Sequence, residues 1–114
     1  MITIWHNPRC SKSRETLALI EASGARPHVR RYLEDPPSVT EITAARDALG
    51  FDTVRDMLRD KEKTFRDLGL STESPEDVLI AAMVAHPILI ERPIVFVDRR
   101  AVLGRPPEAV KTLL

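Results

Sequence analysis

The chain lacks a second cysteine: Cys10 is the only one among its 114 residues. One thiol cannot form an intrachain disulfide, so any oxidised form of Cys10 must be resolved by a second molecule. An excess of charge is also missing, because 17 Lys and Arg balance 17 Asp and Glu. Without a net field, general binding of nucleic acid or of an anionic membrane is disfavoured, and anions would be bound by a few local arginines.

Long apolar runs and a secretory leader are absent too. The longest apolar stretch, 78–85, is followed by His86 and Pro87, and even when extended to Ile90 it falls short of the ~20 residues that span a bilayer. The first ten residues, MITIWHNPRC, lack the basic start and apolar centre of a signal peptide. We therefore expect no membrane span and a location in the reducing cytoplasm, where a lone cysteine is ordinary.

The residues that are present indicate one compact domain, since 43% are apolar and 30% charged. Alternating apolar residues predict the first two strands, and two apolar runs on either side of the polar Asp98-Arg99-Arg100 predict a β-hairpin. Apolar residues at helical spacing predict helices. A capping box at Ser38 and Glu41 would open one helix, and Ser74 would cap another. The expected strands are 2–5, 28–33, 94–97 and 101–103, and the expected helices run from 11 to about 24, from 38 to 50, within 51–69, from 74 onward and from 107 to 114.

These elements give the order β-α-β, several helices, then β-β-α. Without the central helices this is the order of the thioredoxin fold. We predict an α/β, thioredoxin-like fold with a four-stranded mixed sheet in a single domain, 1–114, with a helical insertion at about 38–86. The apolar residues expected to be buried in the insertion are Val54, Met57, Leu58, Phe65, Leu68, Val78, Leu79, Ala82 and Met83.

Cys10 lies in the predicted turn between the first strand and the first helix. The free N–H groups and the positive dipole end of a helix N-terminus stabilise a thiolate and form a cradle for a tetrahedral oxyanion. One short loop could therefore bind an anion and present the nucleophile to it. Nearby side chains that add positive charge or hydroxyl donors are His6, Arg9, Lys12, Arg14, Ser11 and Ser13.

Other roles for Cys10 fit the sequence less well. A buried inert cysteine is disfavoured because residues 7–14 are nearly all polar. A phosphatase loop would need an arginine six residues after the cysteine, where Thr16 stands, and a redox Cys-x-x-Cys pair is excluded by Ser13. A zinc site would have to use His6, Cys10, His28 and His86, whose spacings match no common site, so we expect no metal.

The segment His6–Arg14, HNPRCSKSR, resembles the glutaredoxin-coupled, thioredoxin-like arsenate reductase family, in its Cys-Ser-Lys-Ser-Arg branch. The resemblance runs the whole length of the chain, with separate motifs in the same order. These further motifs are Tyr32–Glu34, Met57–Arg59, His86–Val95 and Gly104–Pro107.

The resemblance implies that Cys10 is the nucleophile and that His6 helps to ionise it, and we count Ser13 with them as a catalytic hydroxyl. It also implies that Arg59, Arg92 and Arg105 hold arsenate, which suits guanidinium groups because they bind tetrahedral oxyanions through two donors. Pro93 would be a cis-proline packed against the cysteine. Ser11, Lys12 and Arg14 of the loop complete the candidate substrate-binding residues.

The function implied is reduction of arsenate to arsenite by a monomer, with glutathione as co-substrate, glutaredoxin as partner and no bound cofactor. Ser11-Lys12 stands where the best-characterised arsenate-resistance members carry a small Gly-Thr type pair. Lys12 could either strengthen oxyanion binding or adapt the site to a different substrate, which leaves open a glutathione-linked thiol oxidoreductase with another substrate. A third alternative is a non-enzymatic, redox-related interaction protein that binds RNA polymerase. Such relatives usually carry a Cys-x-x-Cys switch, so Ser13 argues against this alternative.

Overall fold

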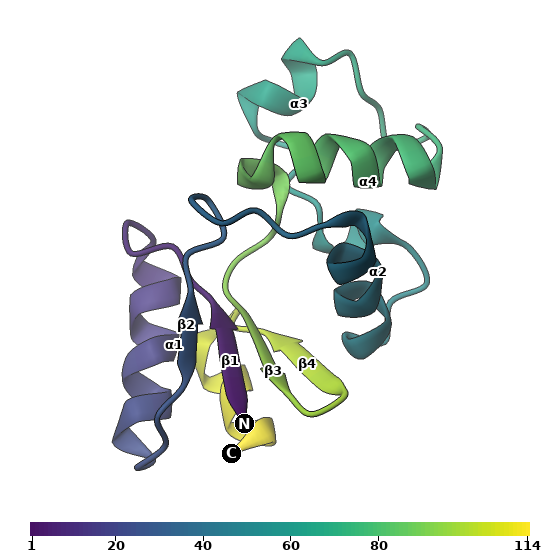
Figure 1. The fold of residues 1–114 in the computed structure, drawn as a ribbon. Helices are drawn as coiled ribbons and strands as arrows, with labels where there is room; N and C mark the ends of the chain where they lie inside the picture. Colours follow the sequence, from purple (N-terminus) through teal and green to yellow (C-terminus); the bar gives the residue numbers. More distant parts are fainter. The chain divides into compact units, whose positions relative to one another are not determined.

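The computed structural model describes residues 1–114 and divides them into two compact units. The first consists of 1–35 and 92–114, and the second of 36–91. The first unit holds the sheet (Figure 1). Its elements are β1 (Ile2–Trp5), α1 (Ser11–Ala22), β2 (His28–Arg30), β3 (Ile94–Val97), β4 (Arg100–Leu103) and the 3₁₀ helix η3 (Pro107–Leu113).

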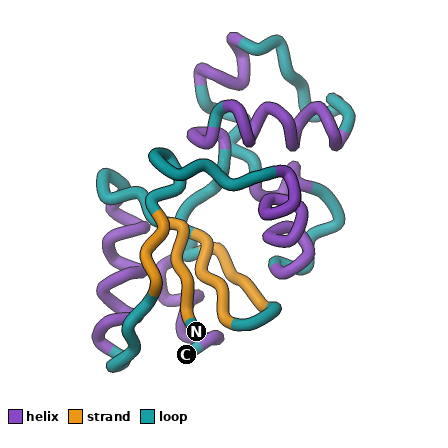
Figure 2. The backbone as a smooth tube through the Cα atoms, viewed as in Figure 1, coloured by secondary structure: helices purple, strands orange, loops and turns teal.

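The sheet has four strands in the order β2-β1-β3-β4, seen in orange in Figure 2. β1 is parallel to β2 and antiparallel to β3, and β3 is antiparallel to β4. Ile4 therefore pairs with Val29 on one side and with Val95 on the other. This topology confirms the α/β, thioredoxin-like fold with a mixed sheet.

The core of the first unit joins the sheet to the two helices that pack against each other, α1 and η3. Ile4 of β1, Ile20 of α1, Val95 of β3 and Val110 of η3 are all fully buried in one cluster. Burying such side chains stabilises the fold by roughly 1.5–3 kcal/mol each. The cluster fixes β1 and α1 together, and the loop that carries Cys10 connects these two elements.

The second unit is helical and corresponds to the predicted insertion, although its bounds are 36–91 rather than 38–86. That the whole chain forms a single domain stays a prediction. Val54, Met57, Leu79 and Met83 are fully buried, as expected, where α2, α4 and η1 pack together. The elements are α2 (Val39–Ala48), η1 (Val54–Met57), α3 (Lys63–Asp67), α4 (Glu76–Ala85) and η2 (Pro87–Leu89).

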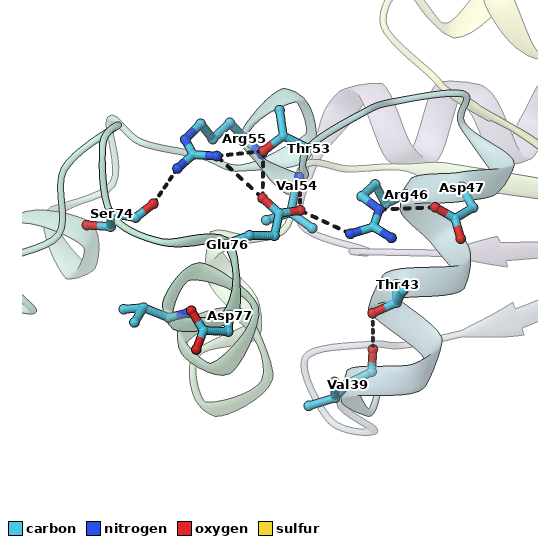
Figure 3. A network of polar contacts seen from close by, with 11 residues as sticks. Val39, Thr43, Arg46, Asp47, Thr53, Val54, Arg55, Ser74, Glu76 and Asp77 are labelled. Carbon is cyan, nitrogen blue, oxygen red and sulfur yellow. Dashed lines mark hydrogen bonds and ion pairs between the residues drawn. The ribbon is translucent and has the colours of Figure 1, made fainter.

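A polar network ties three segments of the second unit together (Figure 3). The Glu76 carboxylate, in the first turn of α4, accepts hydrogen bonds from Thr53 Oγ1 at 2.6 Å and from the Val54 N–H at 2.9 Å. It also accepts from Arg46 of α2 at 3.2 Å and from Arg55 at 3.4 Å. Because one carboxylate satisfies four donors, it fixes η1 and α2 against the start of α4.

The helix signals in the sequence are partly confirmed. The capping box is present: the Glu41 N–H donates to Ser38 Oγ at 3.1 Å, and the Ser38 N–H donates to Glu41 Oε1 at 3.0 Å. The prediction that Ser74 caps α4 is wrong, because Pro75 occupies that position. Ser74 Oγ instead accepts from the Ser71 N–H at 2.9 Å, within the preceding turn.

Three other predictions are wrong in detail. β2 ends at Arg30 rather than at residue 33, because the Arg31 carbonyl accepts from the N–H groups of Glu34 and Asp35 and turns the chain. Leu68 and Val78 are each 43% exposed rather than buried.

Every helix of the chain is too short or too polar to cross a bilayer.

Candidate functional site

The loop between β1 and α1 is shaped by Asn7. Its side-chain oxygen accepts from the Arg9 N–H at 3.0 Å, and its carbonyl accepts from the Cys10 N–H at 3.0 Å. Asn is favoured in such turns because its side chain can mimic a backbone acceptor. The turn delivers Cys10 to the N-cap position of α1, in an extended conformation with φ −97° and ψ 122°.

Cys10 is buried, with 8% of its surface exposed, and polar groups face its sulfur. Burial raises the pKa of the thiol, but the Ser13 N–H, the Arg92 guanidinium and the Lys12 N–H face the sulfur and outweigh that effect. The pKa of Cys10 therefore lies below its ordinary value. The physical cause is the one expected for a helix N-terminus, with an arginine added.

His6 contacts the loop through Ser13. His6 Nδ1 lies 2.6 Å from Ser13 Oγ, which also accepts from the Asn7 N–H at 3.0 Å, and Ser13 is fully buried. Burial, together with Arg31 and Arg14, lowers the pKa of His6, so the ring is neutral at neutral pH. This direction does not favour the positive charge that the sequence led us to expect at His6. It can act as a hydrogen-bonding partner instead.

Arg92 and Arg105 are connected at the start of β3. The Arg92–Pro93 peptide bond is cis, and so is Arg105–Pro106, which the sequence did not indicate. Arg105 Nε donates to the Arg92 carbonyl at 2.9 Å. The structure thus brings Arg92 beside Cys10 and Arg105 beside the backbone of Arg92.

The remaining loop residues differ in their positions. Ser11 and Lys12 form the exposed first turn of α1, and Lys12 contributes its backbone N–H to the sulfur. Arg14 Nη1 donates to the Pro8 carbonyl at 3.0 Å. Its guanidinium therefore braces the loop, and its predicted role in substrate binding stays a prediction.

Arg59 belongs to the second unit. Its guanidinium pairs with Glu62, with Nη1 and Oε1 2.5 Å apart, and lies 3.8 Å from Glu91 Oε1 through Nε. That it joins Arg92 and Arg105 around one anion stays a prediction. The structure contains no group of three or more His, Cys, Asp or Glu side chains that could hold a metal ion.

Sequence reasoning missed the close packing at Gly104. A Cβ atom at this position would lie 2.4 Å from Thr16 Oγ1 and 2.6 Å from Pro93 Cγ. The glycine lets β4 approach α1 and the cis-proline, and its N–H donates to the Pro93 carbonyl at 2.9 Å. The sequence does show a glycine directly before Arg105-Pro106-Pro107. Its position in the sequence does not reveal which atoms a side chain at residue 104 would contact.

The arrangement is suited to nucleophilic chemistry on an anion. A thiolate is the reactive form of cysteine, and N–H groups and a guanidinium stabilise it and also bind oxyanions. Since the chain has one cysteine, any covalent adduct formed on its sulfur would have to be released by another molecule.

Known proteins resemble this chain over nearly its whole length. An arsenate reductase of Haemophilus influenzae is 44% identical over 114 residues, covering 99% of this chain and 98% of that protein. The uncharacterized protein YfgD of Escherichia coli K12 is 46% identical over 110 residues, covering 96% and 92%. The solved structure of an arsenate reductase from Vibrio cholerae superposes with a TM-score of 0.95 at 50% identity, covering 99% of this chain and 97% of that one. The pattern of the ArsC family matches residues 5–113, and the chain therefore belongs to the ArsC family.

Proposed function

We propose that the protein is an arsenate reductase in which Cys10 is the nucleophile and glutathione, with glutaredoxin, supplies the electrons. The observation that carries the proposal is the lowered pKa of Cys10, caused by groups that also bind oxyanions. Family membership and the names of the relatives support arsenate as the substrate.

In the first step the Cys10 thiolate attacks arsenic in bound arsenate. A sulfur–arsenic bond forms, one oxygen takes up protons and leaves as water, and arsenic remains As(V). Arg92 stabilises both the thiolate and the negative charge of the arsenate oxygens, because a guanidinium offers several fixed donors. Arg105 and Arg59 complete the anion site in this proposal.

In the second step a glutathione thiolate attacks the sulfur of Cys10. A sulfur–sulfur bond forms, the sulfur–arsenic bond breaks, and its electron pair stays with arsenic, which leaves as As(III) arsenite. Glutaredoxin then removes glutathione from Cys10 by thiol exchange. An outside reductant is required because the chain has no second cysteine, and a reducing cytoplasm would supply both thiols.

His6 and Ser13 position the loop for this chemistry. The buried Ser13 hydroxyl is held by His6 and by the Asn7 N–H, while the backbone N–H of Ser13 faces the sulfur. A neutral His6 can hydrogen-bond to Ser13 without placing a second cation beside the thiolate. Its contribution is therefore to orientation rather than to charge.

The test is arsenate-dependent NADPH oxidation with glutathione, glutaredoxin and glutathione reductase present. We expect turnover by the wild type and loss of turnover in Cys10→Ser and Arg92→Ala. Arg99→Ala is the matched control, because Arg99 is exposed in the turn at the other end of β3. Mass spectrometry after a single turnover should find one glutathione on Cys10, and turnover without that adduct would refute the cycle.

The lone low-pKa thiol also supports a second candidate, exchange with glutathionylated thiols. The same preparation distinguishes the two. An enzyme that releases glutathione from a mixed disulfide but ignores arsenate would be a thiol oxidoreductase, and arsenate reduction would be ruled out.

A further inference from the structure

Arg59 has a fixed backbone within the second unit. Its N–H donates to the Leu89 carbonyl at 2.7 Å, and the preceding residue, Leu58, forms an isolated antiparallel bridge with Ile90. Leu58, Leu89 and Ile90 are all buried. The position of the Arg59 backbone is therefore set by packing and by the bridge, and does not depend on what its guanidinium binds.

The guanidinium itself is already paired with Glu62. Nη1 of Arg59 lies 2.5 Å from Oε1 of Glu62, and the two side chains are 22% and 23% exposed. A pair that is mostly shielded from water attracts more strongly than an exposed surface pair, since the effective dielectric constant is lower. Glu62 thus holds the donor that the proposed function assigns to an oxyanion.

The Glu62 side chain makes no other stabilising contact besides its pair with Arg59. It is the N-cap residue of α3, where Ser, Thr, Asp and Asn are preferred, but its side chain makes no capping hydrogen bond. Its carboxylate reaches back to Arg59 instead. Neutralising this carboxylate should therefore leave α3 in place.

A carboxylate and an arsenate oxygen are equivalent acceptors for a guanidinium. We infer that Glu62 is a built-in competitor of the oxyanion: Arg59 exchanges Glu62 for the substrate, and Glu62 thereby weakens oxyanion binding and sets its affinity. This inference rests on the proposed function, which places Arg59 at the substrate. A ligand without enough negative charge to displace Glu62 gains nothing from Arg59, so the exchange favours highly charged oxyanions.

A supporting role of Glu62 would change the oxyanion affinity in the opposite direction. If Glu62 served to hold Arg59 in a productive orientation, loss of its charge would weaken oxyanion binding. Competition predicts tighter binding on loss of that charge. The direction of the change in affinity therefore decides between the two roles.

The experiment measures arsenate binding by calorimetry in a Cys10→Ser background, where no covalent step follows binding. We expect Glu62→Gln to tighten arsenate binding about two- to fivefold, the range of a partly exposed ion pair. Glu62→Ser should do the same, and because serine can cap α3 it also guards against a loss of folding. Asp67→Asn is the matched control: it removes the same charge from the same helix, but Asp67 is 56% exposed and pairs with Lys63.

Combining Glu62→Gln with Arg59→Ala completes a double-mutant cycle. Arg59→Ala alone should weaken binding, and in its presence Glu62→Gln should have no further effect. Unchanged or weaker binding in both Glu62 variants, while Arg59→Ala does weaken binding, would overturn the competitor role and leave the proposed function standing. If none of these proteins binds arsenate and the wild type does not reduce it, the proposed function fails and this inference fails with it.

Discussion

Replacing Glu76 with glutamine removes one of the two carboxylate oxygens at the centre of the polar network in Figure 3. Oε1 accepts from Thr53, and Oε2 accepts from the Val54 N–H and from Arg46. The Thr53 hydroxyl cannot reverse its bond, because its oxygen already accepts twice from Arg55. Whichever way the new amide turns, its NH₂ group faces a donor. One donor left without an acceptor costs about 1–3 kcal/mol, and each lost ion pair costs less than about 1 kcal/mol. We therefore expect the free energy of unfolding to fall by about 2–3 kcal/mol.

The free energy of unfolding is measured by urea titration, followed by far-ultraviolet circular dichroism. The control is Asp47→Asn, which removes another carboxylate that pairs with Arg46, at 3.1 Å. Asp47 is 66% exposed, so its loss should cost less than about 0.5 kcal/mol. If Glu76→Gln destabilises the protein no more than Asp47→Asn does, the network does not stabilise the second unit in the way described.

A second readout of the same variant tests the domain organisation. Trp5 is the only tryptophan and lies in the first unit, whereas Glu76 lies in the second. If 1–114 is a single domain, as the sequence predicts, Glu76→Gln shifts the midpoint of Trp5 fluorescence together with that of circular dichroism. A shift in circular dichroism alone would show that the two units unfold separately.

The other predictions concern pH, the thiolate and the packing at the cis-proline. Burial raises the pKa of Glu76, but its hydrogen bonds and Arg46 outweigh burial and hold the pKa below the ordinary value of 4.5. The free energy of unfolding of the wild type should therefore fall as the pH drops below about 4.5 and through the lowered pKa. Glu76→Gln should lessen that fall. Arg92→Gln should raise the pKa of Cys10, seen as a thiolate absorbance that appears at higher pH; an unchanged midpoint would remove Arg92 from the account. Gly104→Ala should destabilise the protein by about 1–3 kcal/mol through overpacking, and a Tm equal to that of the wild type would show that the structure yields there without cost.

The parts of the fold that the sequence predicted are those with local signals. The capping box places the start of α2, the alternation of apolar residues places β1, and an apolar run followed by a polar turn places β3. Each of these signals lies within a few residues of the element that it specifies, so no knowledge of tertiary contacts is needed.

The parts that the sequence did not predict depend on partners far along the chain. Glu76 was expected only as an acid that favours a helix N-terminus, whereas its contacts are with residues 21 to 30 positions away. Val78 lies on the same helix as the buried Leu79, and its exposure depends on which face the neighbouring helices cover. For the same reason, residue types and spacing indicated Cys10 as reactive, but only the resemblance to a family singled out Arg59, Arg92 and Arg105 from the other arginines.

Ser13 joins the two kinds of information. In the sequence it stands where a redox pair would have its second cysteine, and that absence led to the expectation of an outside reductant. In the structure its buried hydroxyl binds His6 and accepts from the Asn7 N–H, while its own N–H faces the Cys10 sulfur. A thiol at this position would be a poor acceptor, because sulfur forms weak hydrogen bonds, and the turn at Asn7 would lose its anchor. Ser13 therefore occupies the position where a second thiol would stand, and it also shapes the loop around the Cys10 thiol. For this reason a single Ser13→Cys exchange would not create a self-resolving site without disturbing Cys10.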